Sequence, residues 1–251
     1  MKKLLIILSL VMLAGVCISA PRKARRRLQL AASGEFSPLD LNLLAWYKGN
    51  NNALDSANGY DGTWVNTEAY TNGINLQALQ TTSGYLTDLN ALSAALGDYN
   101  ALTIACWIRR DTVNDQDRMV NFTIVSTYAK ILFRINIDNK LEIGARAEST
   151  DDFESKITTA TLGIDTWYHV VAVVDIANDN IIFYINGDPT TSTGSPSWAT
   201  TKFSADVGTR STVGRSAGTI ANQFEGAIDD LVFVGRVVTP AEVKQLYEWR
   251  E

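Results

Sequence analysis

The chain has 251 residues and a formal net charge of −5, and 46% of its residues are hydrophobic. This content provides a core that needs neither disulfides nor a metal for stability. The one dense basic run lies near the N-terminus, so the rest of the chain lacks the positive face that phosphate-backbone binding requires, and nucleic acid is excluded as a partner.

The first 20 residues have the pattern of an export leader. Lys2 and Lys3 precede an apolar run over residues 4–18, which has the length of a signal-peptide hydrophobic region and is short for a bilayer span. We therefore expect residues 1–20 to be a signal peptide and the protein to be secreted or displayed on the cell surface. Five positive charges within residues 22–27 oppose translocation, so an uncleaved signal anchor is the alternative, and it would be the only link to a membrane.

A basic segment and linker over residues 21–35 precede a domain expected at residues 36–251. Ser33, Gly34 and Pro38 act as breakers. Beyond them, short apolar runs rich in β-branched and aromatic residues alternate with turn residues, which is typical of many antiparallel strands. The clearest predicted strands span residues 43–48, 102–109, 131–137, 141–145, 167–174, 181–186 and 226–234.

Turn and capping residues complete the expected elements. Residues 138–139 and 178–180 predict two hairpins. A helix is expected over residues 89–96, and a second near the C-terminus, where Thr239 is the N-cap, Pro240 is at the first helical position and Glu242 completes a capping box.

Many strands with little helix predict an all-β fold: a two-sheet antiparallel β-sandwich of the jelly-roll kind with a short C-terminal helix. Trp107 and Trp167 are interpreted as core aromatics, and Cys106 as a small buried hydrophobe, because the only other cysteine is Cys17 in the leader. We expect the buried layer between the sheets to contain Trp107, Ile108, Val171, Val173, Phe183, Ile185, Ile228 and Leu231.

Four sets of segments carry a family resemblance. They are LDSANGYDGT at residues 54–63, LTIACWI at 102–108, TWYHVVAVVD with IFYING at 166–175 and 182–187, and VGR, FEGAIDDL and LY at 213–215, 224–231 and 246–247. In this order they resemble the laminin G-like domains of the concanavalin A-like lectin/glucanase jelly-roll family. Ala57 stands where that family usually has glycine.

The resemblance implies a structural calcium ion. In this family the ion is often held between the early Asp-Ser loop and the acidic pair of the last strand, and calcium prefers several oxygen ligands. The residues that would bind it are Asp55, Asn58, Asp229 and Asp230. We expect residues 55–62 and 229–230 to meet in space. The alternative is that Asp55 caps a turn and the acidic pair is a solvated strand edge.

Catalysis is not expected. His169 is the only histidine and lies within a predicted strand, so a nucleophile–histidine arrangement would have to use it. Hydrolases of this fold need two carboxylates facing a sugar cleft. Asp229 and Asp230, being adjacent in a strand, are expected to point to opposite faces. We therefore expect a non-catalytic extracellular module that binds glycan or a protein surface; the alternatives are a glycoside hydrolase of the same fold and a purely structural or virion-appendage module.

Overall fold

The computed structural model describes residues 36–124, 128–208, 210–216 and 222–250. The chain divides into two units, Met1–Asn42 and Leu43–Glu251. In the described part of the first unit, a short 3-10 helix, η1 (Pro38–Leu41), begins at Ser37, whose side chain accepts a hydrogen bond from the Leu39 backbone N–H. The leader and the whole of the expected linker lie outside the described residues.

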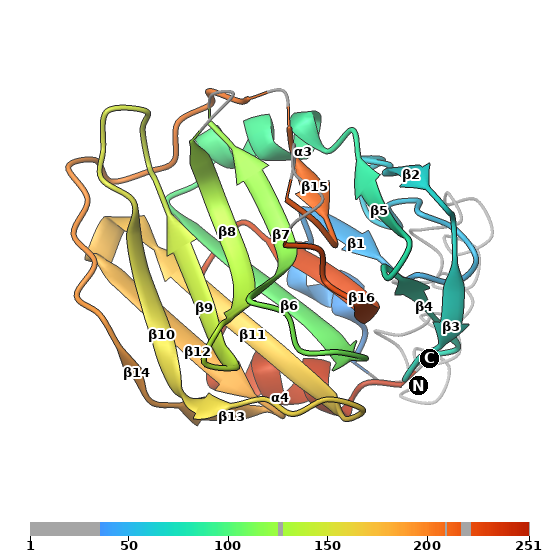
Figure 1. Cartoon of the computed structure of the whole chain (residues 1–251). Helices are drawn as coiled ribbons and strands as arrows, with labels where there is room; N and C mark the ends of the chain where they lie inside the picture. Colours follow the sequence, from blue (N-terminus) through green and yellow to red (C-terminus); the bar gives the residue numbers. More distant parts are fainter. Residues whose placement is uncertain (1–35, 125–127, 209, 217–221, 251) are drawn as a thin grey trace, which may run out of the picture. The chain divides into compact units, whose positions relative to one another are not determined.

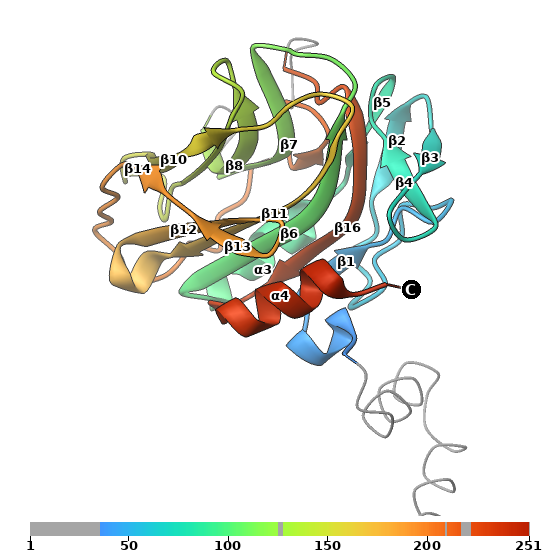
Figure 2. The same ribbon diagram turned by 90° about the horizontal axis from the view of Figure 1, so that it is seen from below.

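The second unit contains two antiparallel sheets that face each other (Figures 1 and 2). The first sheet has the order β13-β12-β11-β6-β16-β4-β3, with β1 also pairing β16, and the second has the order β14-β10-β9-β8-β7-β15-β5-β2. The strands are β1 (Ala45–Tyr47), β2 (Thr63–Asn66), β3 (Tyr70–Asn72), β4 (Gln77–Gln80), β5 (Gly84–Thr87), β6 (Ala101–Arg110), β7 (Gln116–Thr123), β8 (Ala129–Asn136), β9 (Lys140–Ala145), β10 (Glu154–Thr161), β11 (Trp167–Asp175), β12 (Asn180–Ile185), β13 (Asp188–Thr190), β14 (Ser192–Thr193), β15 (Thr212–Val213) and β16 (Gly226–Val234). The predicted β-sandwich is confirmed.

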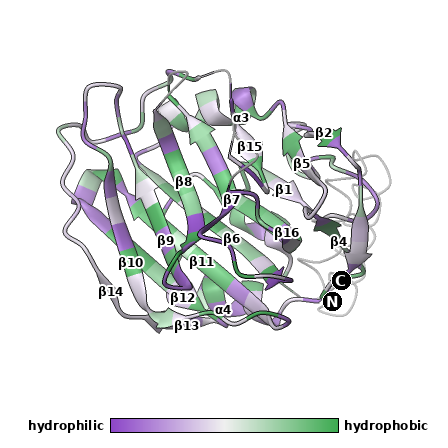
Figure 3. Ribbon diagram, in the orientation of Figure 1, coloured by the Kyte–Doolittle hydropathy of each residue, from purple (hydrophilic) through white to green (hydrophobic). Residues whose placement is uncertain are grey.

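The core between the sheets is built from alternate residues of the long strands. Figure 3 shows apolar residues recurring along the strands of both sheets. Phe122 of the second sheet stacks on Phe233 of the first, with ring centroids 5.6 Å apart, and both side chains are fully buried. Such interdigitation of inward-facing side chains is what holds two aligned sheets together. Cys106 is also in this core, a buried free thiol whose pKa is raised by burial.

Three residues expected between the sheets lie elsewhere. Trp107, Val171 and Val173 are buried, but they alternate with core residues and face outward from the first sheet. Tyr247 of helix α4 (Pro240–Glu248) stacks on Trp107 at 5.4 Å between ring centroids. Figure 2 shows this helix beneath β6, β11 and β16. The first sheet is therefore covered on both faces, which is why its central strands are apolar on both sides.

The two expected helices are present, and the capping of the second is as predicted. Helix α3 spans Asn90–Ala95 and is followed by a 3-10 turn, η2 (Leu96–Asp98). At α4 the Thr239 hydroxyl accepts from the Glu242 backbone N–H, and the Glu242 carboxylate accepts from the Thr239 N–H. No helix in the described ranges is long and apolar enough to cross a membrane.

The expected hairpins join β8 to β9 and β11 to β12. Asn139 turns the first with φ of 60°, in the left-handed region that asparagine tolerates. The second contains a short 3-10 turn, η3 (Ile176–Asn178), before Asp179 takes φ of 51°. Trp167, expected in the core, is instead half-buried at the start of β11, with the Arg109 guanidinium 5.5 Å above its ring.

Phe233→Ala tests the packing between the sheets. Removing a fully buried aromatic side chain should lower the free energy of unfolding by about 3 to 5 kcal/mol, because transfer and cavity costs add. Urea unfolding followed by tryptophan fluorescence measures it. Ile137→Ala, at a side chain that is 66% exposed, is the control and should change stability little. Equal effects of the two substitutions would contradict this description of the core.

Candidate functional site

Asp55 organises the loop that precedes β2. Its Oδ1 accepts from the backbone N–H groups of Trp46 and Ala57 at 2.8 and 2.7 Å, and its Oδ2 accepts from those of Asn58 and Tyr60 at 2.8 and 3.0 Å. A carboxylate offers about four lone-pair positions. All four are therefore used by backbone donors, and the side chain holds the loop against β1.

Asn58 reinforces the same loop. Its side-chain Nδ2 donates to the carbonyl oxygens of Leu43 and Leu44 at 2.7 and 2.9 Å. These bonds fasten the loop to the chain just before β1, so Asn58 acts here through its amide nitrogen rather than through an oxygen.

The acidic pair of β16 lies at a β-bulge, and this corrects the expectation of opposite faces. The register of β16 with β6 shifts between Asp229 and Val232, and Asp230 has φ of 47°. As a result, both carboxylates reach Asn75: Asp229 Oδ2 accepts from its backbone N–H at 2.9 Å, and Asp230 Oδ2 accepts from its side-chain amide at 2.6 Å. A bulge re-aims side chains in this way.

Trp46 connects the two acidic segments. Its backbone N–H donates to Asp55, and its indole Nε1–H donates to Asp230 Oδ1 at 2.8 Å. Both segments thus contact one residue of β1, although no hydrogen bond joins them directly among those described. The expected meeting of residues 55–62 with residues 229–230 takes this indirect form.

The four expected ligands do not fit a shared calcium ion. The carboxylate of Asp55 already accepts hydrogen bonds from backbone N–H groups at all four lone-pair positions. Asn58 donates its amide nitrogen to carbonyl oxygens, and each oxygen of Asp230 accepts from a side-chain donor. No group of three or more acidic, histidine or cysteine side chains suited to a metal occurs within the described ranges. Calcium wants several free oxygens around one point, which this arrangement does not supply.

Of the four expected ligands, Asp229 is the one with a buried carboxylate oxygen that has no hydrogen-bond partner among the described residues. It is fully buried; its Oδ2 accepts from the N–H groups of Ile74 and Asn75, and its Oδ1 has no partner among the described residues. Burial, together with the charge of Asp230, raises the pKa of Asp229 to about 7. A buried carboxyl beside a second carboxylate holds its proton for these two reasons.

His169 is enclosed on the outer face of the first sheet. Its ring lies 5.2 Å from that of Trp107 and 5.9 Å from that of Tyr247, and its Nδ1 has no partner among the described residues. Burial, helped by the nearby Arg250 charge, lowers its pKa to about 3, so the imidazole is neutral at pH 7. This histidine packs beneath α4.

The outer face of the second sheet carries polar side chains in register, of which Glu142, Asn121 and Thr212 are buried. Residues directly opposite one another in antiparallel strands share a face. One row crosses from β10 to β7, and a second crosses from β10 to β15. The first row is Ile157, Glu142, Arg134 and Arg118, and the second is Ser155, Gly144, Leu132, Asn121 and Thr212. Phe133 and Ile135, which flank Arg134 in the chain, point into the core.

Charged, amide and apolar groups meet on this face. Arg134 binds Glu142 through two parallel hydrogen bonds, Nε to Oε2 at 3.0 Å and Nη2 to Oε1 at 2.9 Å. Phe153 is half-buried and lies over Gly144, where any side chain would collide with its ring. The face therefore combines fixed hydrogen-bonding groups with an aromatic edge, the combination that small polar ligands require.

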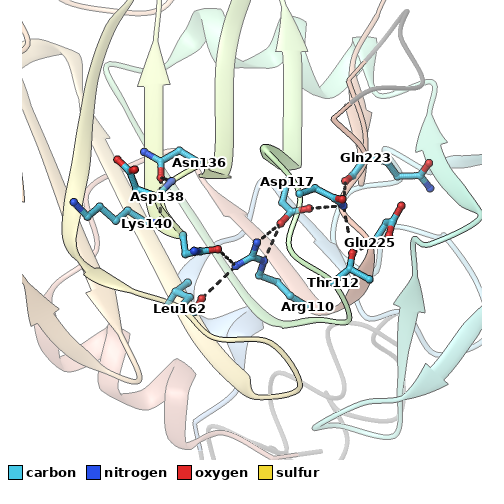
Figure 4. Close-up of polar contacts among 11 residues, drawn as sticks. Arg110, Thr112, Asp117, Asn136, Asp138, Lys140, Leu162, Gln223 and Glu225 are labelled. Carbon is cyan, nitrogen blue, oxygen red and sulfur yellow. Dashed lines mark hydrogen bonds and ion pairs between the residues drawn. The ribbon is translucent and has the colours of Figure 1, made fainter.

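A separate buried ion pair ties the loops at one end of the sandwich (Figure 4). Arg110 binds Asp117 Oδ2 through Nε and Nη2 at 2.8 and 2.7 Å, and its Nη1 donates to Asn139 Oδ1 and to the Leu162 carbonyl. Both charged side chains are almost completely inaccessible to solvent. This cluster holds β6, β7, the β8–β9 hairpin and the end of β10 together, and we assign it a structural role.

Sequence reasoning did not identify the outer face of the second sheet. Arg134 and Glu142 stand at the polar positions of alternating runs, which is the available signal. Their pairing depends on the β8–β9 register, and the place of Arg118 depends on β7, which was not among the strands predicted.

Asp55→Ala should lower thermal stability to the same extent in millimolar calcium and in EGTA. It leaves four backbone N–H groups without their acceptor, and leaving even one buried donor unsatisfied costs about 1 to 3 kcal/mol. Differential scanning fluorimetry of wild type and variant in both buffers measures it. If calcium stabilised the wild type but not the variant, that result would support a metal site at Asp55.

Asp229→Asn should become more favourable relative to wild type as the pH rises. The folded state keeps the Asp229 proton up to pH about 7, whereas the unfolded chain loses it near pH 3.9, so this group destabilises the fold progressively across that window. Chemical unfolding at pH 4, 6 and 8 gives the difference in free energy between the two proteins. A difference independent of pH would show that folding does not raise the pKa of Asp229.

Comparison with known proteins agrees with this architecture. A family model described as the concanavalin A-like lectin/glucanases superfamily matches residues 80–244, and the search of curated proteins gave no match. Domain 4 of AbnA, an extracellular arabinanase from Geobacillus stearothermophilus solved with arabinotriose, superposes with a TM-score of 0.62 at 18% identity, covering 82% of this chain and 98% of that one.

Two larger proteins contain a similar fold. The Trypanosoma rangeli sialidase gives a TM-score of 0.57 at 15% identity, covering 82% of this chain and 32% of that one. The binding domain of botulinum neurotoxin serotype C1 gives 0.58 at 14% identity, covering 84% and 52%. The chain thus spans about a third and a half of their lengths. Together, the family match and the sandwich show that this chain belongs to the concanavalin A-like lectin/glucanases superfamily.

Proposed function

We propose that the chain is a non-catalytic binding module that recognises glycan through the outer face of the second sheet. The observation that carries the proposal is the register of β7, β8 and β9, which sets Arg118, Arg134 and Glu142 side by side on one face. Sugars present several hydroxyl groups, and each can donate and accept a hydrogen bond. Guanidinium donors and a carboxylate acceptor match them.

The rigidity of these groups supports the assignment. They stand on strands, and the Arg134–Glu142 pair is held in a two-point geometry, with 19% of the Arg134 side chain exposed and 8% of that of Glu142. A ligand that meets such groups does not have to order them, which reduces the entropic cost of binding. The Phe153 ring beside them offers an apolar surface for the C–H face of a sugar.

The arrangement of acids supports binding rather than hydrolysis. Glycoside hydrolysis uses two carboxyl groups about 5 to 9.5 Å apart across the scissile bond. Glu142 is the only acid in the two rows of the outer face, and Arg134 binds both of its oxygens. His169, the single histidine, packs neutral beneath α4 on the other sheet.

We further propose that the module works outside the cell or on its surface. The apolar run over residues 4–18 motivates this, and it lies outside the described residues. The arabinanase whose domain 4 shares this fold is described as extracellular, and that domain was solved with arabinotriose. The proposal needs no calcium ion.

Glu142→Gln tests the location of the ligand. A hydrogen bond to a charged group contributes about 1.5 to 3 kcal/mol, so replacing the carboxylate should weaken glycan binding roughly tenfold or more. A glycan array identifies the ligand, and isothermal titration calorimetry measures the change in dissociation constant.

Glu242→Gln is the matched control for this experiment. Arg236 binds Glu242 through two hydrogen bonds of 3.0 and 2.6 Å, and the pair lies at α4, on the other sheet. Glutamine also serves in a capping box. The control should bind like wild type. Equal losses in both variants, or an array on which wild type binds no glycan, would argue against the proposed function and favour a protein partner or a structural role.

A further inference from the structure

Arg118 has only neutral hydrogen-bond partners among the described residues, as Arg146 and Arg250 also do. Arg109, Arg110, Arg134 and Arg236 each form an ion pair with a carboxylate. Within the described ranges, Arg118 pairs with none. It donates from Nη1 to Ser216 Oγ at 2.9 Å and to Asn121 Oδ1 at 3.4 Å, and from Nη2 to Gln116 Oε1 at 3.2 Å. All its acceptors are neutral.

The guanidinium of Arg118 is also incompletely bonded. A guanidinium has five N–H donors in a fixed fork. The Nε of Arg118 is buried without a hydrogen-bond partner among the described residues, and the whole side chain is half-buried. Burial and the neighbouring Arg134 charge lower the pKa of Arg118, and the Glu142 charge only partly offsets this. A charge held in this way is costly unless an anion balances it.

The neighbouring carboxylate is already engaged. Arg118 and Arg134 stand directly opposite each other in β7 and β8, and Glu142 lies on the far side of Arg134, bound by both of its oxygens. The two rows of the outer face therefore contain two guanidinium groups and one carboxylate. This local excess of positive charge occurs in a chain whose formal net charge is −5.

We infer that Arg118 is the anion subsite of this face, and that the glycan bound there bears an acidic group, a carboxylate or a sulfate ester. This inference rests on the proposed function. The planar fork of arginine matches the two oxygens of such a group. Glu142 and Arg134 would then bind the hydroxyl groups of the adjoining sugar, while Ser216 and Gln116 hold the Arg118 fork in place.

An array with three classes of glycan tests the inference: neutral oligosaccharides, oligosaccharides that contain uronic or sialic acid, and sulfated oligosaccharides. Wild type should bind acidic members and not their neutral counterparts. Binding to the carboxylated class alone, to the sulfated class alone or to both identifies the acidic group, and each result supports the inference. Arg118→Gln should weaken binding of the acidic members roughly tenfold to a hundredfold.

Two further variants complete the design. Arg118→Lys keeps the charge and loses the fork, so it should also bind more weakly than wild type, and it keeps the test valid if the glutamine variant fails to fold. Arg236→Gln makes the same charge change at α4 and should leave binding unaffected. Equal binding of neutral and acidic glycans, or unchanged affinity in both Arg118 variants, would overturn the inference while leaving glycan recognition standing. A wild-type protein that binds no glycan would instead refute the proposed function.

Discussion

The need to cover both faces of the first sheet is the constraint on which the rest of the structure depends. β6, β11 and β16 carry apolar side chains toward the second sheet and also away from it. Helix α4 meets the second requirement by placing Tyr247 on Trp107 and His169. The outer face of this sheet is thereby closed by the protein itself. The polar rows lie on the outer face of the second sheet, where we propose that the ligand binds.

The position of these rows is fixed by the pairing of the strands and by the packing of the core. Binding groups on strands are fixed by the hydrogen-bond ladder, and a slip of one residue would turn all of them into the core. The core side chains Phe133 and Ile135 prevent that slip because they flank Arg134 and require burial. The same alternation therefore sets both the stability of the sandwich and the order of the groups on its outer face.

The sequence identified the sheets better than the polar contacts. The seven strongest apolar runs all became strands, and the Thr239 capping box formed as expected, because both depend on local patterns. β7 and β10 escaped prediction because polar residues interrupt their apolar pattern. The bulge at Asp230 and the four donors around Asp55 depend on partners far along the chain, so the calcium interpretation had no local evidence against it.

The buried thiol of Cys106 reports on the opening of the sandwich. It lies in the core on β6, opposite the bulge of β16, and burial keeps it protonated. Only a thiolate in contact with solvent reacts with alkylating reagents. Modification at this position therefore waits for the two sheets to separate, and its rate follows the opening of the whole sandwich rather than the fraying of a loop.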